Sequence, residues 1–314
     1  MKGLELSRRF YEECGRPILE EQFSHLLPYL AVGLSGSGSE CFGYDDDLSR
    51  DHDFEPAFCI FLPDESIVDR KSAFALERAY AKLPKEFLGV RRNKMSAVGG
   101  DRHGVIRMSE FFEARTGSSD GKLSLGQWFS LPEQALLEAV NGEVFFDHYG
   151  EFTQIRERIS YFPEDVRLKK LAGNLLLMGQ AGEYNYGRCI RRGETAAAQL
   201  AMYEFVKSAM NAAYLLEKRY MPYYKWSFRG LREFSKKGER LAGMLEFLIS
   251  SDNCEDTAEK KSEMIEAVCK MIIDELQGQQ LTNCAATEME RQAYVVNDRI
   301  ADGQIRNLHI LSAV

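Results

Sequence analysis

Residues 31–39 read Ala-Val-Gly-Leu-Ser-Gly-Ser-Gly-Ser, and residues 49–54 read Ser-Arg-Asp-His-Asp-Phe. The first stretch predicts a short apolar strand that ends in a Gly-Ser turn. The second stretch carries two carboxylates at positions i and i+2, Asp51 and Asp53. Residues two apart in a strand point to the same face, so both carboxylates can bind one divalent cation beside the turn.

These two stretches suit nucleotidyl transfer, which needs a held triphosphate and Mg²⁺ ions beside its α-phosphate. Gly38 has no side chain, so the backbone can approach phosphates there, and Ser39 offers a hydroxyl and an N–H group. A D-x-D pair supplies the oxygen ligands that Mg²⁺ prefers. The sequence therefore predicts that Gly38 and Ser39 bind the triphosphate, and that Asp51 and Asp53 bind the metal and serve catalysis.

The composition is that of a soluble globular protein, with 314 residues, 45% apolar and 28% charged, and a net charge of −8. The acidic balance argues against broad binding to nucleic acid. The cysteines are scattered, without a C-x-x-C pair, and no apolar run resembles a signal peptide or a membrane span. We expect a cytoplasmic protein without a membrane partner.

The pattern of apolar residues changes near residue 155. Before it, the predicted strands are residues 27–35, 54–62 and 104–108, and the predicted helices are residues 4–14, 17–26, 66–83 and 131–140. After Pro163, helical spacing is nearly continuous, and the predicted helices are residues 164–183, 195–220, 230–250, 257–276 and 288–305. We expect an α+β fold: a domain of residues 1–155 with a mixed sheet and helices binds nucleotide and metal, and a helical bundle of residues 156–314 binds the acceptor.

Two groups of aromatic and cationic residues stand out in the helical half. Residues 184–193 read Tyr-Asn-Tyr-Gly-Arg-Cys-Ile-Arg-Arg-Gly, and residues 218–226 read Lys-Arg-Tyr-Met-Pro-Tyr-Tyr-Lys-Trp. Such residues suit a pocket in which a base stacks and a phosphate is paired, so we expect Arg188, Tyr224 and Lys225 to bind the nucleotide, with the two groups close together. Tyrosine and tryptophan at helix ends also pack against a core with one polar tip outward, and that alternative stays open.

The sequence resembles the polymerase-β-like nucleotidyltransferase superfamily in the run from Gly38-Ser39 to Gly43, followed by Asp51-x-Asp53. That superfamily includes aminoglycoside and lincosamide nucleotidyltransferases, minimal nucleotidyltransferases and adenylyl-transferring toxins. The resemblance implies that Gly38 and Ser39 bind a nucleoside triphosphate and that Asp51 and Asp53 bind Mg²⁺.

A longer likeness covers roughly residues 23–226. Four segments resemble a bacterial family of unknown function that is placed in the same superfamily. These segments are residues 33–43, 49–53, 186–193 and 219–226. Active members of the superfamily usually carry a third carboxylate on a later strand, but the matching predicted strand, residues 104–108, has none. Asp101 and Glu110 flank that strand. Either another residue provides the third ligand, or the protein is a weak or inactive transferase.

We therefore expect a Mg²⁺-dependent nucleotidyltransferase that moves a nucleoside monophosphate from a triphosphate to a hydroxyl of a small molecule or macromolecule. One alternative is a catalytically degenerate nucleotide-binding sensor or interaction module on the same fold. Another is a toxin-like transferase that acts on tRNA or protein, against which the net charge counts mildly. One fold hosts many acceptors, so the sequence identifies neither the acceptor, nor the preferred base, nor the oligomeric state.

Overall fold

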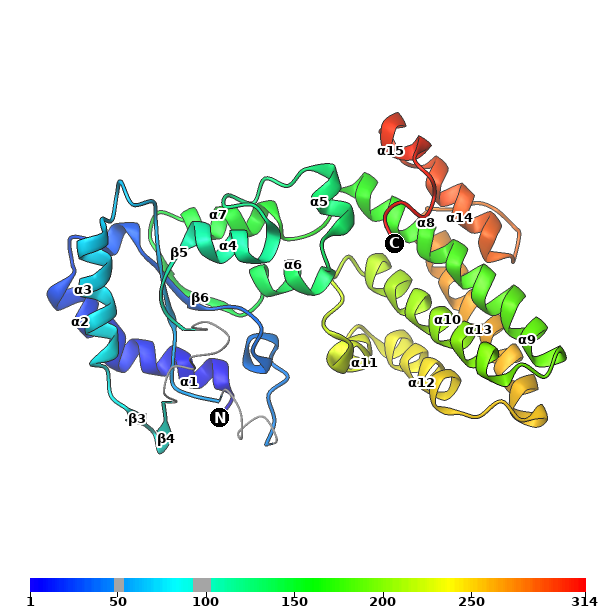
Figure 1. Ribbon diagram of the computed structural model, residues 1–314, viewed down its shortest axis with the longest axis horizontal. Helices are drawn as coiled ribbons and strands as arrows, with labels where there is room; N and C mark the ends of the chain where they lie inside the picture. The colour runs from blue at the N-terminus through cyan, green and yellow to red at the C-terminus, as the bar shows by residue number, and fades with distance from the viewer. Residues whose placement is uncertain (48–53, 93–102) are drawn as a thin grey trace. The chain divides into compact units, whose positions relative to one another are not determined.

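The computed structural model describes residues 1–47, 54–92 and 103–314. The chain divides into two compact units (Figure 1). Unit 1 comprises Met1–Gln127 and Ala135–Ser160, and unit 2 comprises Trp128–Gln134 and Tyr161–Val314. The division thus falls after residue 160 rather than 155. The apolar pattern also does not predict that residues 128–134 belong to the helical unit.

The sheet of unit 1 is mixed and has the strand order β5-β2-β1-β6. The strands are β1 (Ala31–Leu34), β2 (Cys59–Leu62), β5 (Gly104–Arg107) and β6 (Glu143–Asp147). β1 pairs antiparallel with β2 and β6, whereas β2 pairs parallel with β5. The three predicted strands are confirmed in shorter form, and β6 is a fourth strand that the sequence pattern does not reveal.

Prolines account for the shorter strands, because they lack the N–H group that a ladder needs. Pro28 lies in a 3₁₀ turn, Leu27–Tyr29, so β1 begins only at Ala31. Pro56 precedes β2, which begins at Cys59. The Gly-Ser turn that follows β1 therefore starts from the interior of the sheet, where β2 and β6 hold β1 on both sides.

Side chains of β2 alternate between two apolar layers, as the period of a strand requires. Ile60 and Leu62 join a core with residues of the N-terminal helices and of α3. Phe61 faces the other layer, where its ring centroid lies 4.0 Å from that of Phe152 and 5.0 Å from that of Phe111. The helices of this part are α1 (Gly3–Phe10), α2 (Arg16–Gln22), α3 (Arg70–Ala81), α4 (Met108–Thr116), α5 (Leu125–Ser130), α6 (Glu133–Val140) and α7 (Glu151–Arg158), with a short hairpin of β3 (Glu86–Phe87) and β4 (Val90–Arg91).

The backbones of β1 and β6 approach closely at two glycines. A Cβ atom at Gly33 would lie 2.5 Å from the Glu143 carbonyl oxygen. Gly142 has a φ of +67°, and a Cβ atom there would lie 1.9 Å from the Leu34 carbonyl oxygen. Both glycines are therefore needed where β6 passes the end of β1, next to the Gly-Ser turn.

Unit 2 is helical. Its helices are α8 (Glu164–Met178), α9 (Gly187–Arg191), α10 (Thr195–Leu216), α11 (Tyr224–Arg232), α12 (Lys236–Ser250), α13 (Glu255–Gly278), α14 (Met289–Asp298) and α15 (Gly303–Asn307), and a π-helical stretch, Gly179–Tyr186, joins α8 to α9. The five helices predicted after Pro163 are confirmed in position. Two of them are divided, because Ser235 caps a new helix, α12, and Asp302 caps α15.

α8 packs against α10 and α14, and it is buried almost all round. Three of its buried residues are cations, and each donates to a backbone carbonyl of another segment. Arg167 donates to the Leu215 carbonyl at 3.1 Å, and Lys169 donates to the Leu308 carbonyl at 2.7 Å. Lys170 donates to the Ala313 carbonyl at 3.1 Å. Since a buried cation without partners is costly, these bonds fix the segments to α8.

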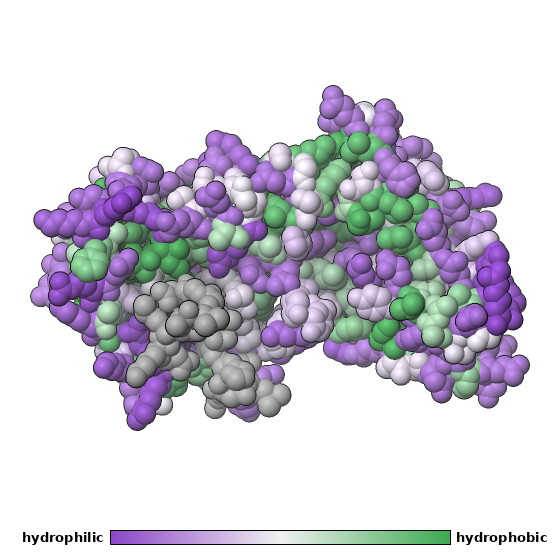
Figure 2. Space-filling view, viewed as in Figure 1, coloured by the Kyte–Doolittle hydropathy of each residue, from purple (hydrophilic) through white to green (hydrophobic). Residues whose placement is uncertain are grey.

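None of the helices in the described part of the chain is long and apolar enough to cross a membrane. Figure 2 shows hydrophilic side chains over much of the visible face, with apolar side chains gathered in smaller patches.

Candidate functional site

The Gly-Ser loop, residues 35–39, connects β1 to a 3₁₀ helix, Ser39–Phe42. Gly36 has a φ of +136°, a conformation that residues with side chains rarely adopt. Ser37 is exposed and Ser39 is half-buried, whereas Ser35, Gly36 and Gly38 are buried. The loop therefore presents Ser37 and part of Ser39 to solvent.

Asn141, at the end of α6, holds the first half of the loop. Its Nδ2 donates to the Gly36 carbonyl at 2.7 Å, and its Oδ1 accepts from the Gly36 N–H at 2.9 Å. The same Oδ1 accepts from the Ser35 hydroxyl at 3.3 Å. The Asn141 side-chain amide thus makes the two hydrogen bonds that a neighbouring strand would make to Gly36. These bonds fix the first half of the loop and leave Ser37 uncovered.

Two N–H groups of the loop are available for a ligand. The N–H groups of Ser37 and Ser39 make no hydrogen bond to any part of the chain that the structure describes, whereas the Gly38 N–H between them interacts with the Cys41 sulfur. Backbone N–H groups are obligatory hydrogen-bond donors, so the two free ones need water or a ligand. Backbone donors close together in a loop are an arrangement that binds anions.

A carboxylate lies on the side of Gly38 that a side chain would occupy. A Cβ atom at Gly38 would lie 1.9 Å from Oε1 of Glu40, whose side chain is buried. The missing side chain of Gly38 therefore makes room for Glu40, which is a reason for glycine beside the predicted approach of a phosphate. Phosphate binding at Gly38 stays a prediction.

Arg115, on α4, brings a positive charge to the loop. One of its terminal nitrogens lies 3.2 Å from the position that a Cβ of Gly36 would take. The guanidinium lies over the Phe111 ring at 3.8 Å and donates to the Phe111 carbonyl at 2.9 Å. Its buried Nε has no hydrogen-bond partner among the residues that the structure describes. Burial lowers the pKa of Arg115, although not enough to deprotonate a guanidinium. The cation therefore lies beside Gly36, at the start of the Gly-Ser loop, with one donor unused among the described residues.

The two predicted metal ligands, Asp51 and Asp53, lie outside the described residues. The third predicted strand, β5, is confirmed, and it has no acidic residue. Of its two acidic neighbours, Glu110 is exposed on α4 and Asp101 lies outside the described residues. Residues 1–47, 54–92 and 103–314 hold no group of three or more metal-ligating side chains.

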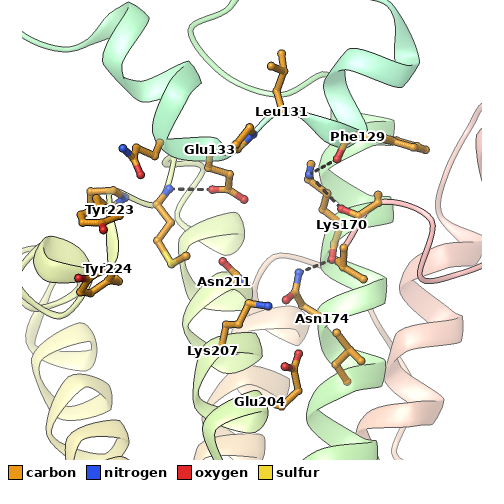
Figure 3. A pocket seen from close by; sticks show the side chains of 17 residues that line it. Phe129, Leu131, Glu133, Lys170, Asn174, Glu204, Lys207, Asn211, Tyr223 and Tyr224 are labelled. Carbon is orange, nitrogen blue, oxygen red and sulfur yellow. Dashed lines mark hydrogen bonds between the residues drawn. The ribbon is translucent and has the colours of Figure 1, made fainter. Parts of the chain in front are cut away.

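Unit 2 contains a cavity of about 550 Å³ (Figure 3). We call it the α8–α10 cavity. Its polar lining consists of two carboxylates, two ammonium groups and three amides, namely Glu133, Glu204, Lys170, Lys207, Gln134, Asn174 and Asn211. Its apolar lining consists of Phe129, Leu131, Pro132, Leu177, Met221, Pro222, Tyr223, Tyr224, Ala313 and Val314. A cavity of this size, mostly apolar with a few convergent polar groups, is typical of small-molecule sites.

Glu133 is the titratable group of this cavity with the strongest perturbation. Burial raises its pKa to about 7, against the hydrogen bond from the Met221 N–H at 2.8 Å and the positive charge of Lys170. Lys170 itself donates to the Phe129 carbonyl at 3.3 Å and to the Ala313 carbonyl at 3.1 Å, and burial lowers its pKa. A carboxyl that titrates near neutral pH is a feature of functional sites more often than of ordinary surfaces.

Only one of the three nucleotide contacts predicted for the helical half lines this cavity. Tyr224 does so, with its ring centroid 4.2 Å from that of Tyr223. Lys225 Nζ lies 5.2 Å from the Trp226 ring, outside the cavity. Arg188 lies over the Tyr184 ring at 4.6 Å and donates to its hydroxyl. Whether these side chains contact a nucleotide stays a prediction.

The predicted proximity of the two aromatic and cationic groups is wrong. α9, which holds Arg188, precedes α10, and α11, which begins at Tyr224, follows it. α10 has 22 residues and separates them by about 33 Å at 1.5 Å per residue (Figure 1). The two groups lie at opposite ends of this helix, so they cannot line one pocket.

Residues 128–227 match a family model described as Domain of unknown function (DUF4037). The match covers about a third of the chain, and it includes every residue that lines the α8–α10 cavity except Ala313 and Val314. No curated protein and no solved structure matches the chain.

Proposed function

We propose that the chain is a Mg²⁺-dependent nucleotidyltransferase, which transfers a nucleoside monophosphate from a nucleoside triphosphate to a hydroxyl and releases pyrophosphate. The observation that carries the proposal is the pair of free N–H groups at Ser37 and Ser39 in the Gly-Ser loop. The Arg115 guanidinium beside Gly36 supports it, because a cation and backbone donors together suit a phosphate chain. The resemblance of the run from Gly38-Ser39 to Gly43, followed by Asp51-x-Asp53, to polymerase-β-like nucleotidyltransferases is a second support.

In this proposal the chain contributes positioning and electrostatic stabilisation rather than a covalent intermediate. The free N–H groups of the loop hold phosphate oxygens, and Arg115 offsets part of their negative charge. Asn141 keeps the loop in place through both Gly36 backbone groups. Asp51 and Asp53 would hold Mg²⁺, which when bound neutralises the charge that develops on the phosphates.

Glu40 lies beside the loop that would hold the phosphates. Its carboxylate lies against Gly38, so a Mg²⁺ ion between it and a phosphate on the loop would be attracted to both. We therefore propose Glu40 as a third acidic residue of the metal site, in place of the acid that β5 lacks. Glutamate oxygens are ligands that Mg²⁺ accepts.

A second candidate function, nucleotide sensing without turnover, is favoured by the sequence of β5. That strand, Gly-Val-Ile-Arg, holds a cation and no carboxylate. If the acid is not replaced by Glu40, metal coordination is weaker and the acceptor hydroxyl lacks a general base. The sensor and the enzyme share nucleotide binding and differ only in pyrophosphate release.

Thermal unfolding with each of the four nucleoside triphosphates, with and without Mg²⁺, tests both candidates. We expect one triphosphate to raise the midpoint by several degrees only when Mg²⁺ is present. Pyrophosphate release in the same samples, with candidate hydroxyl acceptors added, supports the enzyme. A Mg²⁺-dependent shift without release under any of these conditions supports the sensor. The absence of a shift with all four triphosphates contradicts both.

The double substitution Asp51→Asn and Asp53→Asn assigns the metal site. We expect it to remove the Mg²⁺-dependent shift and to lower pyrophosphate release at least about 100-fold, while the midpoint without nucleotide is unchanged. The matched control is Asp46→Asn with Asp47→Asn, which removes the same charge from two exposed residues of the same connection. An equal loss in both double variants would mean that only net charge matters.

A further inference from the structure

The α8–α10 cavity is built from five separate segments of unit 2. They are residues 129–134, helices α8 and α10, residues 221–224 and residues 313–314. In Figure 3 the labelled side chains of Glu133, Lys170 and Asn174 surround one space, which Tyr223 borders. Because all five segments belong to one unit, the cavity is a property of that unit alone.

Glu133 lacks a cationic partner inside this cavity. The carboxylate accepts the Met221 N–H, but no ammonium or guanidinium lies within 4.0 Å of it in the described part of the chain. Lys170, the cation that most affects it, is directed to two backbone carbonyls instead. A carboxylate that is largely removed from water and lacks a counter-charge gains most from a cationic ligand.

Two amides of the cavity also have unused hydrogen-bonding capacity. Asn174 is 5% exposed, and its Nδ2 donates to the Lys170 carbonyl at 2.9 Å. Its Oδ1 has no partner among the described residues, and the same holds for the whole side-chain amide of Asn211. These groups are suited to a ligand hydroxyl, which both donates and accepts.

The remaining wall is apolar and partly aromatic. Met221, Pro222 and Tyr223 follow one another along one side, and Leu177 lies on α8. Such a wall binds a hydrocarbon or aromatic skeleton by removing it from water. The three kinds of lining thus require three features in one ligand: a cationic amine, a hydroxyl and an apolar body.

We propose that the α8–α10 cavity binds a small hydroxylated amine, with its ammonium on Glu133, its hydroxyl on Asn174 or Asn211 and its carbon skeleton against Met221 and Pro222. This site is separate from the Gly-Ser loop and does not rest on the proposed transferase activity.

The probe is tyramine, which has an ammonium, a ring and a hydroxyl, and its control is 4-ethylphenol, which lacks the amine. Binding to the full chain is measured by isothermal titration at pH 8 without nucleotide, so the result is independent of the transferase proposal. We expect saturable tyramine binding at about 1 mM, a value typical of a ligand with ten heavy atoms. We expect 4-ethylphenol to bind at least tenfold more weakly. Equal binding of the two compounds, or no saturable tyramine binding up to 20 mM, overturns the proposal.

Glu133→Gln locates the amine. Glutamine keeps an acceptor for the Met221 N–H, so the fold should persist, and we expect tyramine affinity to fall at least tenfold. The matched control is Glu239→Gln, an exposed glutamate on α12 outside the cavity, which should leave affinity unchanged. Unchanged affinity in Glu133→Gln contradicts the assignment.

The pH dependence of the unmodified chain gives a test that needs no variant. The charged or titratable groups that interact with Glu133 are Lys170 on α8 and the tyrosines Tyr161 and Tyr220, whose pKa values are raised by burial. The other charged groups that line the cavity are Glu204 and Lys207 on α10. The tyrosines stay neutral between pH 6 and 8, but the Glu133 carboxyl does not. For a pKa of about 7, its ionised fraction rises from about a tenth at pH 6 to about nine tenths at pH 8. We expect tyramine affinity to rise about tenfold over this range. A flat profile overturns the proposal.

Discussion

The two candidate sites offer different kinds of polar group. The Gly-Ser loop of unit 1 offers the backbone N–H groups of Ser37 and Ser39. The α8–α10 cavity of unit 2 offers side chains from five segments. The first depends on glycines and on a fixed backbone, whereas the second depends on charged groups that are only partly compensated. Substitutions in the Gly-Ser loop should therefore act through backbone strain. Substitutions in the α8–α10 cavity should act through charge, and their effects should depend on pH.

The largest effect is expected where unit 1 needs a glycine. Gly142→Ala places a Cβ atom 1.9 Å from the Leu34 carbonyl oxygen, at a φ of +67°. We expect it to lower the free energy of unfolding of unit 1 by about 4 kcal/mol, from backbone strain and overpacking together. The matched control is Gly43→Ala, where φ is +71° but nothing lies within 4 Å, and the expected cost is about 1 kcal/mol.

The two tryptophans allow this effect to be assigned to a unit. Trp128 and Trp226 both belong to unit 2, so their fluorescence reports that unit, whereas far-ultraviolet circular dichroism reports both. In urea, Gly142→Ala should move part of the dichroism transition to lower urea and leave the fluorescence transition in place. Equal costs for the two alanine variants would contradict the close approach of β6 to the end of β1.

The Gly-Ser loop is easier to predict from the sequence than the α8–α10 cavity, because its residues are neighbours in the chain. Glycines, serines and a strand that adjoin one another produce a recognisable pattern, so the loop and three of the four main strands are predictable from residues 27–39, 54–62 and 104–108. β6 is not, because its sequence Glu-Val-Phe-Phe-Asp directly follows the predicted helix 131–140 and lacks clear alternation.

The partners of the loop are not predictable either. Asn141 and Arg115 lie about 105 and 79 positions from Gly36 along the chain, and only tertiary packing brings them to it. The same applies to Glu133, whose role depends on Met221 and Lys170. The Arg188 and Lys225 groups look like neighbours in the sequence, but α10 is a rigid helix of 22 residues that keeps them apart. Predictions from a single sequence are strongest where the interacting groups are neighbours in the chain.

A second test concerns the charge in unit 2. The pKa of Glu133 is raised from 4.5 to about 7 in the folded state. Between these values the folded state keeps a proton that the unfolded state releases, so the stability of unit 2 should fall as pH rises from 4.5 to 7. The fall is at most about 3 kcal/mol, at 1.36 kcal/mol per pKa unit. Urea midpoints followed by tryptophan fluorescence at each pH measure it.

Glu133→Gln should remove most of that slope, because glutamine does not titrate. The variant should match the unmodified chain near pH 4 and be more stable above pH 7. The same slope in both proteins would assign the pH dependence to other groups and would place the pKa of Glu133 near its ordinary value.

A smaller effect is expected from the amide that holds the loop. Asn141→Ala removes two hydrogen bonds to Gly36 and leaves a buried carbonyl and N–H without partners, at a cost of about 2 kcal/mol to unit 1. The matched control in unit 2 is Asn211→Ala, whose side-chain amide makes no hydrogen bond among the described residues, and whose cost should stay within about 0.5 kcal/mol. Urea unfolding followed by circular dichroism compares them, and equal costs would mean that Asn141 does not fix the loop.

The smallest effect is expected at the aromatic and cationic group of α9. Arg188 lies over the Tyr184 ring at 4.6 Å, but the ring is 58% exposed. Water screens the cation there, so the interaction should contribute about 0.5 kcal/mol. A double-mutant cycle with Arg188→Met and Tyr184→Leu isolates this value from the effects of each substitution alone. A coupling above about 1.5 kcal/mol would indicate that the pair is desolvated in solution, as it would be if another surface covered this end of α10. Coupling that rises only when a nucleoside triphosphate is added would instead support the predicted contact between Arg188 and the nucleotide, because a bound phosphate would order both side chains.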